Sequence, residues 1–406
     1  MVESVRELIK AHEGVEREVY LDIENSAPVP EEVVRAMLPY FNVKAYGNPT
    51  LTHKPGWEAY ETIISSAKKI AQYVGAKNPE EINFLPGETE ANNLAIIGTA
   101  YKRKGDGNKI IVSEIEPLNI IHVCKMLEKY GFKVEKIPVD GEGFINLEWL
   151  KEKVDNNTIM VSVSFVNNEI GTVQPIRDAV DIVKAKKGEI IFHTDLSDAY
   201  GRIRFDLNRI PVDLATISSY KILGPRGIGA LYVRDGVKIE RILEGQIGTQ
   251  KLWPGVENTP LIVGFAKASE LEFENFEQNI NHMRRLRDKL IDDILNRING
   301  TLLNGPSDGK RSPDNVNISF LKCEGESLTI ELSLKGVYVS SGSACTRRVL
   351  QPSHVLTAIG RRFEEAHGSI LMKVTRYHTE EDIDYVLKVM PAAVERLRKI
   401  YGSMGE

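Results

Sequence analysis

Residues 158–195, TIMVSVSFVNNEIGTVQPIRDAVDIVKAKKGEIIFHTD, decide the fold. Residues 158–165 form a short strand-like run, and residues 176–187 place apolar side chains at helical spacing. Residues 189–195 then form an apolar run that ends in a carboxylate, Asp195. A strand, a helix and a second strand in this order are typical of an α/β domain whose buried sheet is mostly parallel.

The same alternation continues on both sides of this stretch. Before it, the pattern predicts helices over residues 57–75, 88–103 and 120–131 and strands over residues 81–85 and 109–113. After it, strands are predicted over residues 214–219 and 229–233. We therefore expect one large α/β domain with a mostly parallel sheet flanked by helices.

The C-terminal third has a different pattern. Residues 262–298 predict one long amphipathic helix. The elements predicted after it are strands over residues 315–321, 337–341 and 369–375 and helices over residues 325–336, from Pro352 and from Glu380. This mixture predicts a smaller α+β domain, formed by residues 1–20 and 263–406, beside a large domain of residues 21–262.

Composition narrows the class of protein. The 406 residues carry a net charge of −5, which offers no basic surface for nucleic acid or an anionic membrane. No run of about 18 apolar residues predicts a membrane helix, and the charged N-terminal residues do not resemble a secretory signal. Three widely spaced cysteines argue against a disulfide framework. We expect a cytoplasmic protein without a metal site, in which His193 is a packed core residue.

Lys221 is the first candidate for chemistry. It follows the strand at 214–219 and precedes a glycine-rich turn in SSYKILGPRGIGALYV, residues 218–233. An apolar wall can lower the pKa of a lysine at this place, which makes the amine a usable nucleophile. The alternative is a surface lysine whose ammonium group reaches solvent.

Two further segments lie where ligands bind in α/β sheets. Asp195 ends its strand, and a carboxylate there needs a positive partner such as a protonated pyridine nitrogen. It could equally be a turn or helix-capping residue. PGETEANN, residues 86–93, follows a strand and opens a helix, so Thr89 and the free N–H groups of the first turn can bind an anion. Glu88 and Glu90 could instead be acids that the helix dipole favours.

A cysteine completes the set of candidates. VSSGSACTRR, residues 339–348, places Cys345 among small polar residues that predict a solvated loop. Arg347 and Arg348 would favour its thiolate, which is the nucleophilic form. Taken alone, Cys345 would be an incidental free thiol. A lysine amine, a buried carboxylate, a phosphate-ready helix start and a loop thiol together suit pyridoxal 5′-phosphate (PLP) chemistry.

With these segments the chain resembles the cysteine desulfurases of the class V aminotransferase family, in family order and nearly without gaps from about residue 18 to 395. The segments that carry the resemblance are VYLD (19–22), YGNPTLTHKPGWEA (46–59), GETEANNLAI (87–96), FVNNEIGTVQPI (165–176), FHTDLSDAYGRI (192–203), SSYKILGPRGIGALYV (218–233), NVNISF (315–320), EGESL (324–328), VSSGSACTRRVLQPSHVLTAIG (339–360), AHGSI (366–370) and TRYHTEEDID (375–384). The family implies a large PLP-transferase domain with a seven-stranded sheet.

The resemblance also implies roles and partners. Lys221 would hold PLP covalently, Asp195 would hold its pyridine nitrogen, and Cys345 would take sulfur from L-cysteine as a persulfide while alanine leaves. The other positions implied at the cofactor are Glu88, Thr89, Asn168, Asp198, Ser218 and Tyr220. The implied partners are a second copy of the chain, in a homodimer, and a sulfur-acceptor or scaffold protein for iron–sulfur assembly or tRNA thiolation.

Several positions depart from the family pattern. The departures are Pro117 for a histidine that stacks on PLP, Asp198 for a glutamine, Tyr220 for a histidine, Glu88 for an alanine, Val256 for a phosphate-binding threonine and Leu371 for the arginine that binds the substrate carboxylate. Two alternatives to a desulfurase therefore stay open. One is a different PLP-dependent lyase or aminotransferase on the same fold, and the other is a desulfurase-like scaffold or sulfur carrier with weak or no PLP binding.

Overall fold

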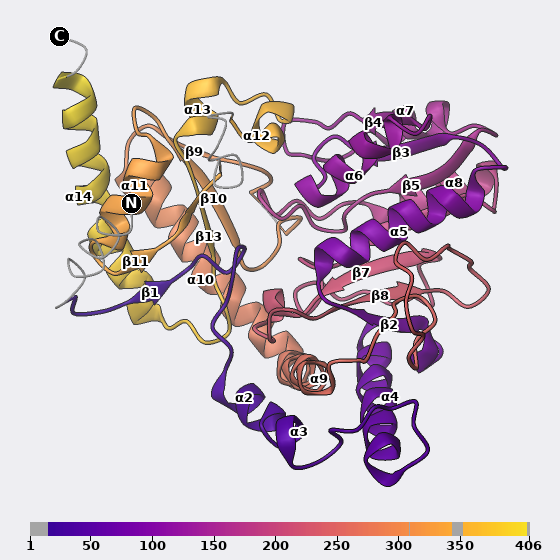
Figure 1. Ribbon diagram of the computed structural model, residues 1–406. Coiled ribbons are helices and arrows are strands. Elements are labelled where there is room, and N and C mark those ends of the chain that lie inside the picture. The colour runs from indigo at the N-terminus through magenta and orange to yellow at the C-terminus, as the bar shows by residue number, and fades with distance from the viewer. Residues whose placement is uncertain (1–14, 308, 343–351, 404–406) are drawn as a thin grey trace.

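A computed structural model gives the fold and describes residues 15–307, 309–342 and 352–403 (Figure 1). Its largest sheet has seven strands in the order β2-β8-β7-β6-β5-β3-β4. These strands are β2 (Ile82–Leu85), β3 (Lys109–Ser113), β4 (Lys133–Ile137), β5 (Thr158–Ser162), β6 (Ile191–Asp195), β7 (Leu214–Ser218) and β8 (Gly229–Val233). β8 runs antiparallel to both of its neighbours, and the other neighbouring pairs are parallel. The predicted mostly parallel, seven-stranded sheet is confirmed.

Helices cover both faces of this sheet. The helices of this part of the chain are α2 (Glu31–Met37), α3 (Pro39–Asn42), α4 (Lys54–Val74), α5 (Glu88–Arg103), α6 (Leu118–Glu128), α7 (Leu147–Lys153), α8 (Ile176–Lys186) and α9 (Thr259–Phe273), with short 3-10 turns η1 (Pro79–Glu81) and η2 (Tyr220–Ile222). Successive strand residues point to opposite faces, so Ile110 and Leu214 pack with α5 and α6, whereas Ile111 and Ala215 pack with α4, α8 and α9. Burial on both faces explains the continuous apolar runs of the central strands.

The smaller α+β unit is also confirmed. Its four-stranded antiparallel sheet has the order β12-β13-β10-β9. Its elements are α10 (Phe276–Arg297), β9 (Thr301–Leu303), β10 (Asn315–Phe320), α11 (Gly325–Ser333), β11 (Val337–Tyr338), β12 (Ser340–Ser341), α12 (His354–Ala358), α13 (Phe363–His367), β13 (Ser369–Lys373) and α14 (Glu380–Ser403). β1 (Val19–Tyr20) pairs in parallel with β11, and Figure 1 shows this indigo strand beside the orange and yellow elements. The N-terminal strand therefore packs with the end of the chain.

The prediction of one long helix over residues 262–298 is wrong. The helix ends at Phe273 and a second helix begins at Phe276, because Asn275 between them has a non-helical backbone (φ −122°, ψ 44°). α9 packs Phe265 and Ala268 into the core of the large sheet, whereas α10 packs Ile280 into the core of the smaller unit. A break lets the two helices face different cores. We therefore propose that the boundary between the two units lies at this break rather than after residue 262.

Other differences concern short or exposed elements. The predicted strand over residues 337–341 is two strands, β11 and β12, which belong to different sheets. The pattern gave no prediction for β4, whose sequence KVEKI is largely solvent-facing at the sheet edge and carries three charges. None of the helices in the described parts of the chain is both long and apolar enough to cross a membrane.

Arg202 joins the two units. Its side chain is 3% exposed, its Nε donates to Oδ2 of Asp314 at 3.0 Å, and its guanidinium group pairs with Glu272 of α9. Asp314 directly precedes β10 of the smaller unit. Without Arg202, the buried Asp314 would lose its ion pair, whereas Glu272 would keep its pair with Arg376.

Arg202→Ala is expected to lower the free energy of unfolding by about 3–5 kcal/mol, because the buried Asp314 loses its ion pair while Glu272 keeps only Arg376. The control is Arg204→Ala, since Arg204 forms an exposed pair with Glu277 and is 71% exposed. That change is expected to cost less than about 1 kcal/mol. Urea unfolding of both variants checks this, and equal losses would contradict the assigned role.

Candidate active site

The candidate site lies at the carboxyl ends of two neighbouring parallel strands. β6 ends at Asp195 and β7 ends at Ser218, and Lys221 follows β7 on the short turn η2. All three side chains are buried, with Lys221 6% exposed. The sheet therefore brings together an amine, a carboxylate and a hydroxyl at the edge where open α/β sheets bind ligands.

Lys221 is surrounded by carboxylates. Its Nζ lies 2.6 Å from Oδ2 of Asp198, 3.0 Å from Oε1 of Glu24 and 3.5 Å from Oε2 of Glu88. Burial lowers the pKa of Lys221, but the negative charges of Asp198 and Glu24 outweigh it and raise the pKa well above its ordinary value. The expectation that an apolar wall lowers this pKa is therefore wrong, because the wall is acidic.

Two members of this cluster, Glu24 and Lys373, were not predicted. Nζ of Lys373 contacts Oε2 of Glu24 at 2.5 Å and also pairs with Oδ1 of Asp198. Glu24 lies just after β1 and Lys373 ends β13, so neither is near Lys221 in the sequence. The signal that could have found Lys373 is a single charge inside an otherwise apolar strand, SILMKVT, because a lysine buried there needs an acidic partner.

Asp195 is held by two hydrogen bonds. The side-chain amide of Asn92 donates to its Oδ2 at 2.7 Å, and the backbone N–H of Ser197 donates to its Oδ1 at 2.8 Å. Burial raises the pKa of Asp195, while the positive charge of Lys221 acts in the opposite direction. A buried carboxylate in this position is suited to a cationic ring nitrogen, which would offset the cost of its burial.

Glu88 begins α5 and turns its carboxylate toward Lys221. Its Oε1 accepts a hydrogen bond of 3.1 Å from the side-chain amide of Asn119. Burial raises its pKa to about 7, against the lowering effect of Lys221. Glu88 is thus partly ionised near neutral pH. Thr89, the next residue, is exposed on the first turn of the helix.

Asn168 and Tyr220 both reach Glu24. The amide of Asn168 donates to Oε1 of Glu24 at 2.9 Å, and the hydroxyl of Tyr220 donates to the backbone carbonyl of Glu24 at 3.0 Å. The predicted residues Lys221, Glu88, Asp198, Asn168 and Tyr220 therefore meet around one carboxylate cluster. Cys345, Arg347 and Arg348 lie outside the described residues.

The remaining departures have different surroundings. Pro117 precedes α6 as its N-terminal cap residue. Leu371 is buried on β13, where it pairs with Asn317 and Ser340 of the neighbouring strands. Val256 is 64% exposed, so its side chain is open to solvent in the single chain.

His193 is a packed core residue, as predicted. Its Nδ1 lies 2.8 Å from the hydroxyl of Ser162, and its Nε2 lies 3.1 Å from the hydroxyl of Thr216. Burial lowers its pKa to about 3, so the ring is neutral. Within the part of the chain that the structure describes, no group of His, Cys, Asp and Glu side chains is arranged to hold a metal ion.

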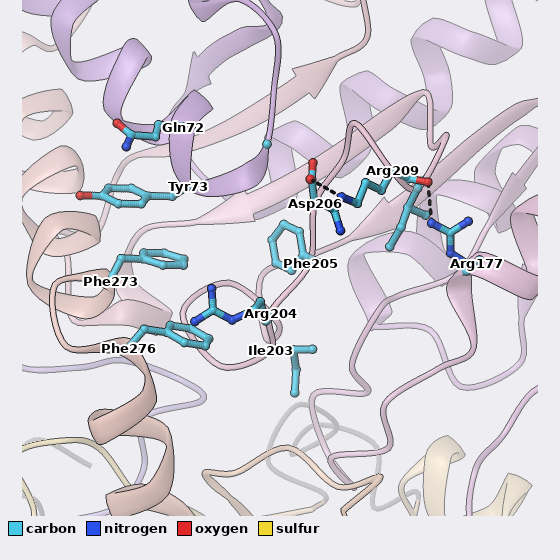
Figure 2. Close-up of a pocket in the computed structure, with 12 residues that line it drawn as sticks. Gln72, Tyr73, Arg177, Ile203, Arg204, Phe205, Asp206, Arg209, Phe273 and Phe276 are labelled. Carbon is cyan, nitrogen blue, oxygen red and sulfur yellow. Dashed lines mark hydrogen bonds and ion pairs between the residues drawn. The ribbon is translucent and has the colours of Figure 1, made fainter.

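A separate surface cavity of about 680 Å³ contains none of the predicted residues (Figure 2). Tyr73, Phe273 and Phe276 line one side, where stacked rings lie 4.5 Å and 5.4 Å apart between centroids. Figure 2 shows Arg204 beside Phe276 and Arg209 beside Asp206. Only Arg204 contacts the stack among these three charged residues, and we assign this cavity no role in the chemistry.

The residues at the sheet edge fit PLP. Asp195 faces the site with a carboxylate that lacks a cationic partner within hydrogen-bond distance among the described residues. The buried hydroxyl of Ser218 also has no hydrogen-bond partner in the described part of the chain. Gly87 caps α5 without a side-chain bond, which leaves the first N–H groups of a 16-residue helix available to a phosphate. Two acids on the first turn of α5, Glu88 and Glu90, oppose an anion here.

Comparison with known proteins agrees with this geometry. The family model described as Aminotransferase class-V matches residues 19–386. A relative from Archaeoglobus fulgidus, named cysteine desulfurase IscS 1, is 44% identical over 381 residues, which are 94% of this chain and 98% of the relative. A cysteine desulfurase IscS from Dictyoglomus turgidum is 42% identical over 386 residues, 95% of this chain and 97% of the relative.

Solved structures give the same result. One described as a NifS-like protein has a TM-score of 0.86 and 34% identity, covering 94% of this chain and 99% of its own. Another, described as SspA in complex with cysteine, has a TM-score of 0.76 and 31% identity, covering 89% and 100%. The predicted desulfurase-like enzyme is therefore confirmed at the level of the family. This chain belongs to the class V aminotransferases, and the relatives that match it over nearly their whole length are cysteine desulfurases.

Proposed function

We propose that this protein is a PLP-dependent cysteine desulfurase, which takes sulfur from L-cysteine and holds it as a persulfide on Cys345. The observation that carries the proposal is the arrangement of Lys221, Asp195 and Ser218 at the carboxyl ends of β6 and β7. The solved relative in complex with cysteine supports the class of substrate.

Each residue of the site has a separate role in the proposed reaction. When bound, PLP supplies an electron sink for the bonds around Cα of an amino acid. Lys221 provides the amine that holds the cofactor and then carries protons to and from the substrate. Asp195 keeps a proton on the ring nitrogen. Ser218 and the N–H groups at the start of α5 bind the phosphate.

Cys345 is the acceptor of sulfur in this proposal. Its thiolate attacks the sulfur of the substrate, a sulfur–sulfur bond forms, and the bond between that sulfur and Cβ breaks. The electron pair stays with the substrate carbon, which takes a proton. L-cysteine and the Cys345 thiol thus become alanine and a Cys345 persulfide without an external oxidant. The persulfide is then available to a sulfur-acceptor or scaffold protein, as iron–sulfur assembly or tRNA thiolation requires.

The described residues on either side of the segment that carries Cys345 both lie near Glu169. Ser353, which follows it, donates to Oε2 of Glu169 at 2.7 Å. Gly342, which precedes it, lies so close that an added Cβ would meet Oε1 of Glu169 at 2.8 Å. Glu169 is the neighbour of Asn168, whose amide contacts Glu24 beside Lys221. This supports a thiol positioned to serve the Lys221 site.

The described cysteines support the same assignment. Cys124 and Cys323 are free thiols and are buried, with 2% and 6% of their surface exposed. Burial raises the pKa of Cys124 to about 12, so its thiolate is rare at neutral pH. Free thiols also suit the reducing cytoplasm, where we propose that the protein acts.

We propose further that the protein is a homodimer. Seven large apolar side chains between residues 38 and 60 are exposed: Leu38, Phe41, Val43, Tyr46, Leu51, Trp57 and Tyr60. They belong to the region of α2, α3 and α4, which lie together at the lower end of Figure 1. Exposed apolar residues gathered in one region favour a protein partner. A solution mass equal to that of one chain would contradict the dimer.

Alanine release from L-cysteine in the presence of PLP tests the proposed reaction. Lys221→Ala is expected to lower the rate by at least about 100-fold, because the amine that moves protons is lost. The control is Lys238→Ala, since Lys238 is exposed and lies outside the site, and it is expected to retain the wild-type rate. Products other than alanine, or turnover of other amino acids only, would favour a different PLP-dependent enzyme.

A further inference from the structure

The amines of Lys221 and Lys373 share two carboxylates. Glu24 contacts Lys221 through Oε1 and Lys373 through Oε2. Asp198 contacts Lys221 through Oδ2 and Lys373 through Oδ1. The four groups form a closed arrangement of alternating charge, which we call the charge square. The side chains of both lysines are 5% exposed, so water screens the square only weakly.

The charge square is balanced only while both lysines are protonated. An amine must lose its proton before it can act as a nucleophile, so the Lys221 amine would have to be neutral at the moment it reacts. Glu24 and Asp198 would then be two buried carboxylates with one cation between them. A carboxylate that is buried without a cation is strongly unfavourable. The remaining cation, Lys373, therefore stabilises Glu24 and Asp198 while the Lys221 amine is neutral.

We propose that Lys373 is the positioning residue for Lys221: it keeps Glu24 and Asp198 paired while the Lys221 amine gives up its proton. This inference rests on the proposed function, in which that amine holds PLP. Lys373 does not touch the reacting atoms. It acts through the two carboxylates that both amines share.

The other ionisable groups around Lys221 cannot replace Lys373. Those that face Lys221 are Glu24 after β1, Glu88 on α5, Asp195 and Asp198 on and after β6, and Tyr220 on η2. Four of these five are acids, and the hydroxyl of Tyr220 donates to a backbone carbonyl. The nearby Arg376 pairs instead with Glu272. Among the described residues, Lys373 is therefore the second cation that Glu24 and Asp198 contact.

Competitive labelling with acetic anhydride measures the effect without PLP. The protein is labelled at pH 8.5, and mass mapping of peptides gives the rate of acetylation at Lys221, with exposed Lys68 as the internal reference. Lys373→Met is expected to slow labelling of Lys221 by about tenfold. Glu24, Asp198 and Glu88 then face a single ammonium group, and the loss of a nearby like charge raises the pKa of that group by about 1 unit or more. Lys373→Arg is expected to keep the wild-type rate.

A merely structural role for Lys373 predicts the opposite change, because a loosened site would expose Lys221 and speed its labelling. The double variant Lys373→Met with Asp198→Asn removes one charge of each sign and is expected to restore the rate. An unchanged or faster rate in Lys373→Met, or no recovery in the double variant, overturns the inference.

PLP uptake is measured separately by absorbance. Wild-type protein that takes up no PLP but shows the labelling pattern would overturn the proposed function and leave the role of Lys373 standing.

Discussion

Cys345→Ser is expected to lower persulfide formation by about a thousandfold or more while PLP uptake stays at the wild-type level. The nucleophile that receives the sulfur is lost, whereas the residues that hold the cofactor are untouched. The two described cysteines cannot take over, since both are buried and the pKa of Cys124 is raised to about 12. Labelling with radioactive sulfur from L-cysteine, read on the intact protein, measures the effect.

Cys323→Ser is the matched control. Its thiol is 6% exposed and lies in the core of the smaller unit, so persulfide formation is expected to be unchanged. If the Cys345→Ser protein were labelled as strongly as the wild type, a residue other than Cys345 would have to accept the sulfur. That result would also remove the reason for a thiol in the segment whose flanks meet Glu169.

Glu88→Ala is expected to tighten PLP binding by about 10- to 100-fold at pH 8. Two unit charges about 5 Å apart repel by about 3 kcal/mol at an effective dielectric constant near 20, and the substitution removes this repulsion from the phosphate. It also removes one of the carboxylates that keep Lys221 protonated. Equilibrium titration with PLP, followed by absorbance, gives the dissociation constant.

The pH dependence gives a second readout for Glu88. Because burial raises its pKa to about 7, Glu88 is mostly neutral at pH 6 and mostly ionised at pH 8. A bound phosphate favours the neutral form, so wild-type affinity is expected to weaken as the pH rises through 7. The weakening is expected to be smaller in Glu88→Ala. Glu148→Ala, which removes an exposed acid on α7 away from the site, is the control. An identical pH profile in all three proteins would contradict the role of Glu88.

The raised pKa values of buried acids also make the stability of the folded protein depend on pH. A carboxyl group whose pKa is raised on folding binds more protons in the folded state between its ordinary pKa and the raised one. Glu88, Glu116 and Glu169 have pKa values raised to about 7, 8 and 8, mainly by burial. Each therefore lowers the stability of the free protein as the pH rises from about 4.5 toward 8. Burial of Glu88, Glu116 and Glu169 therefore costs folding free energy at neutral and higher pH.

The sequence predicts the large sheet well because its strands are continuous apolar runs, and this signal is local. The same local signal predicts that Asp195 ends a strand and that Lys221 follows one, and the structure has both there. The prediction of one long helix was wrong because helix signals are also local. Helical spacing continues through residues 262–298, and nothing local states that α9 and α10 face different cores.

The surroundings of Lys221 could not be read from local pattern. Glu24 and Lys373 are separated by 349 residues in the sequence, yet their side chains contact each other beside Lys221. The prediction of a lowered pKa for Lys221 was wrong because it considered only the apolar residues of the preceding strand. The charge of a buried lysine depends on partners that several distant segments supply, and here they are acidic.

The central claim is that Lys221 holds PLP in spite of this acidic cluster. The most direct measurement is an absorbance spectrum of the purified protein with added PLP, followed by borohydride reduction and peptide mass mapping. We expect a visible absorption band and a PLP adduct fixed on Lys221. Absence of both band and adduct, or an adduct on Lys373 instead, would contradict the account.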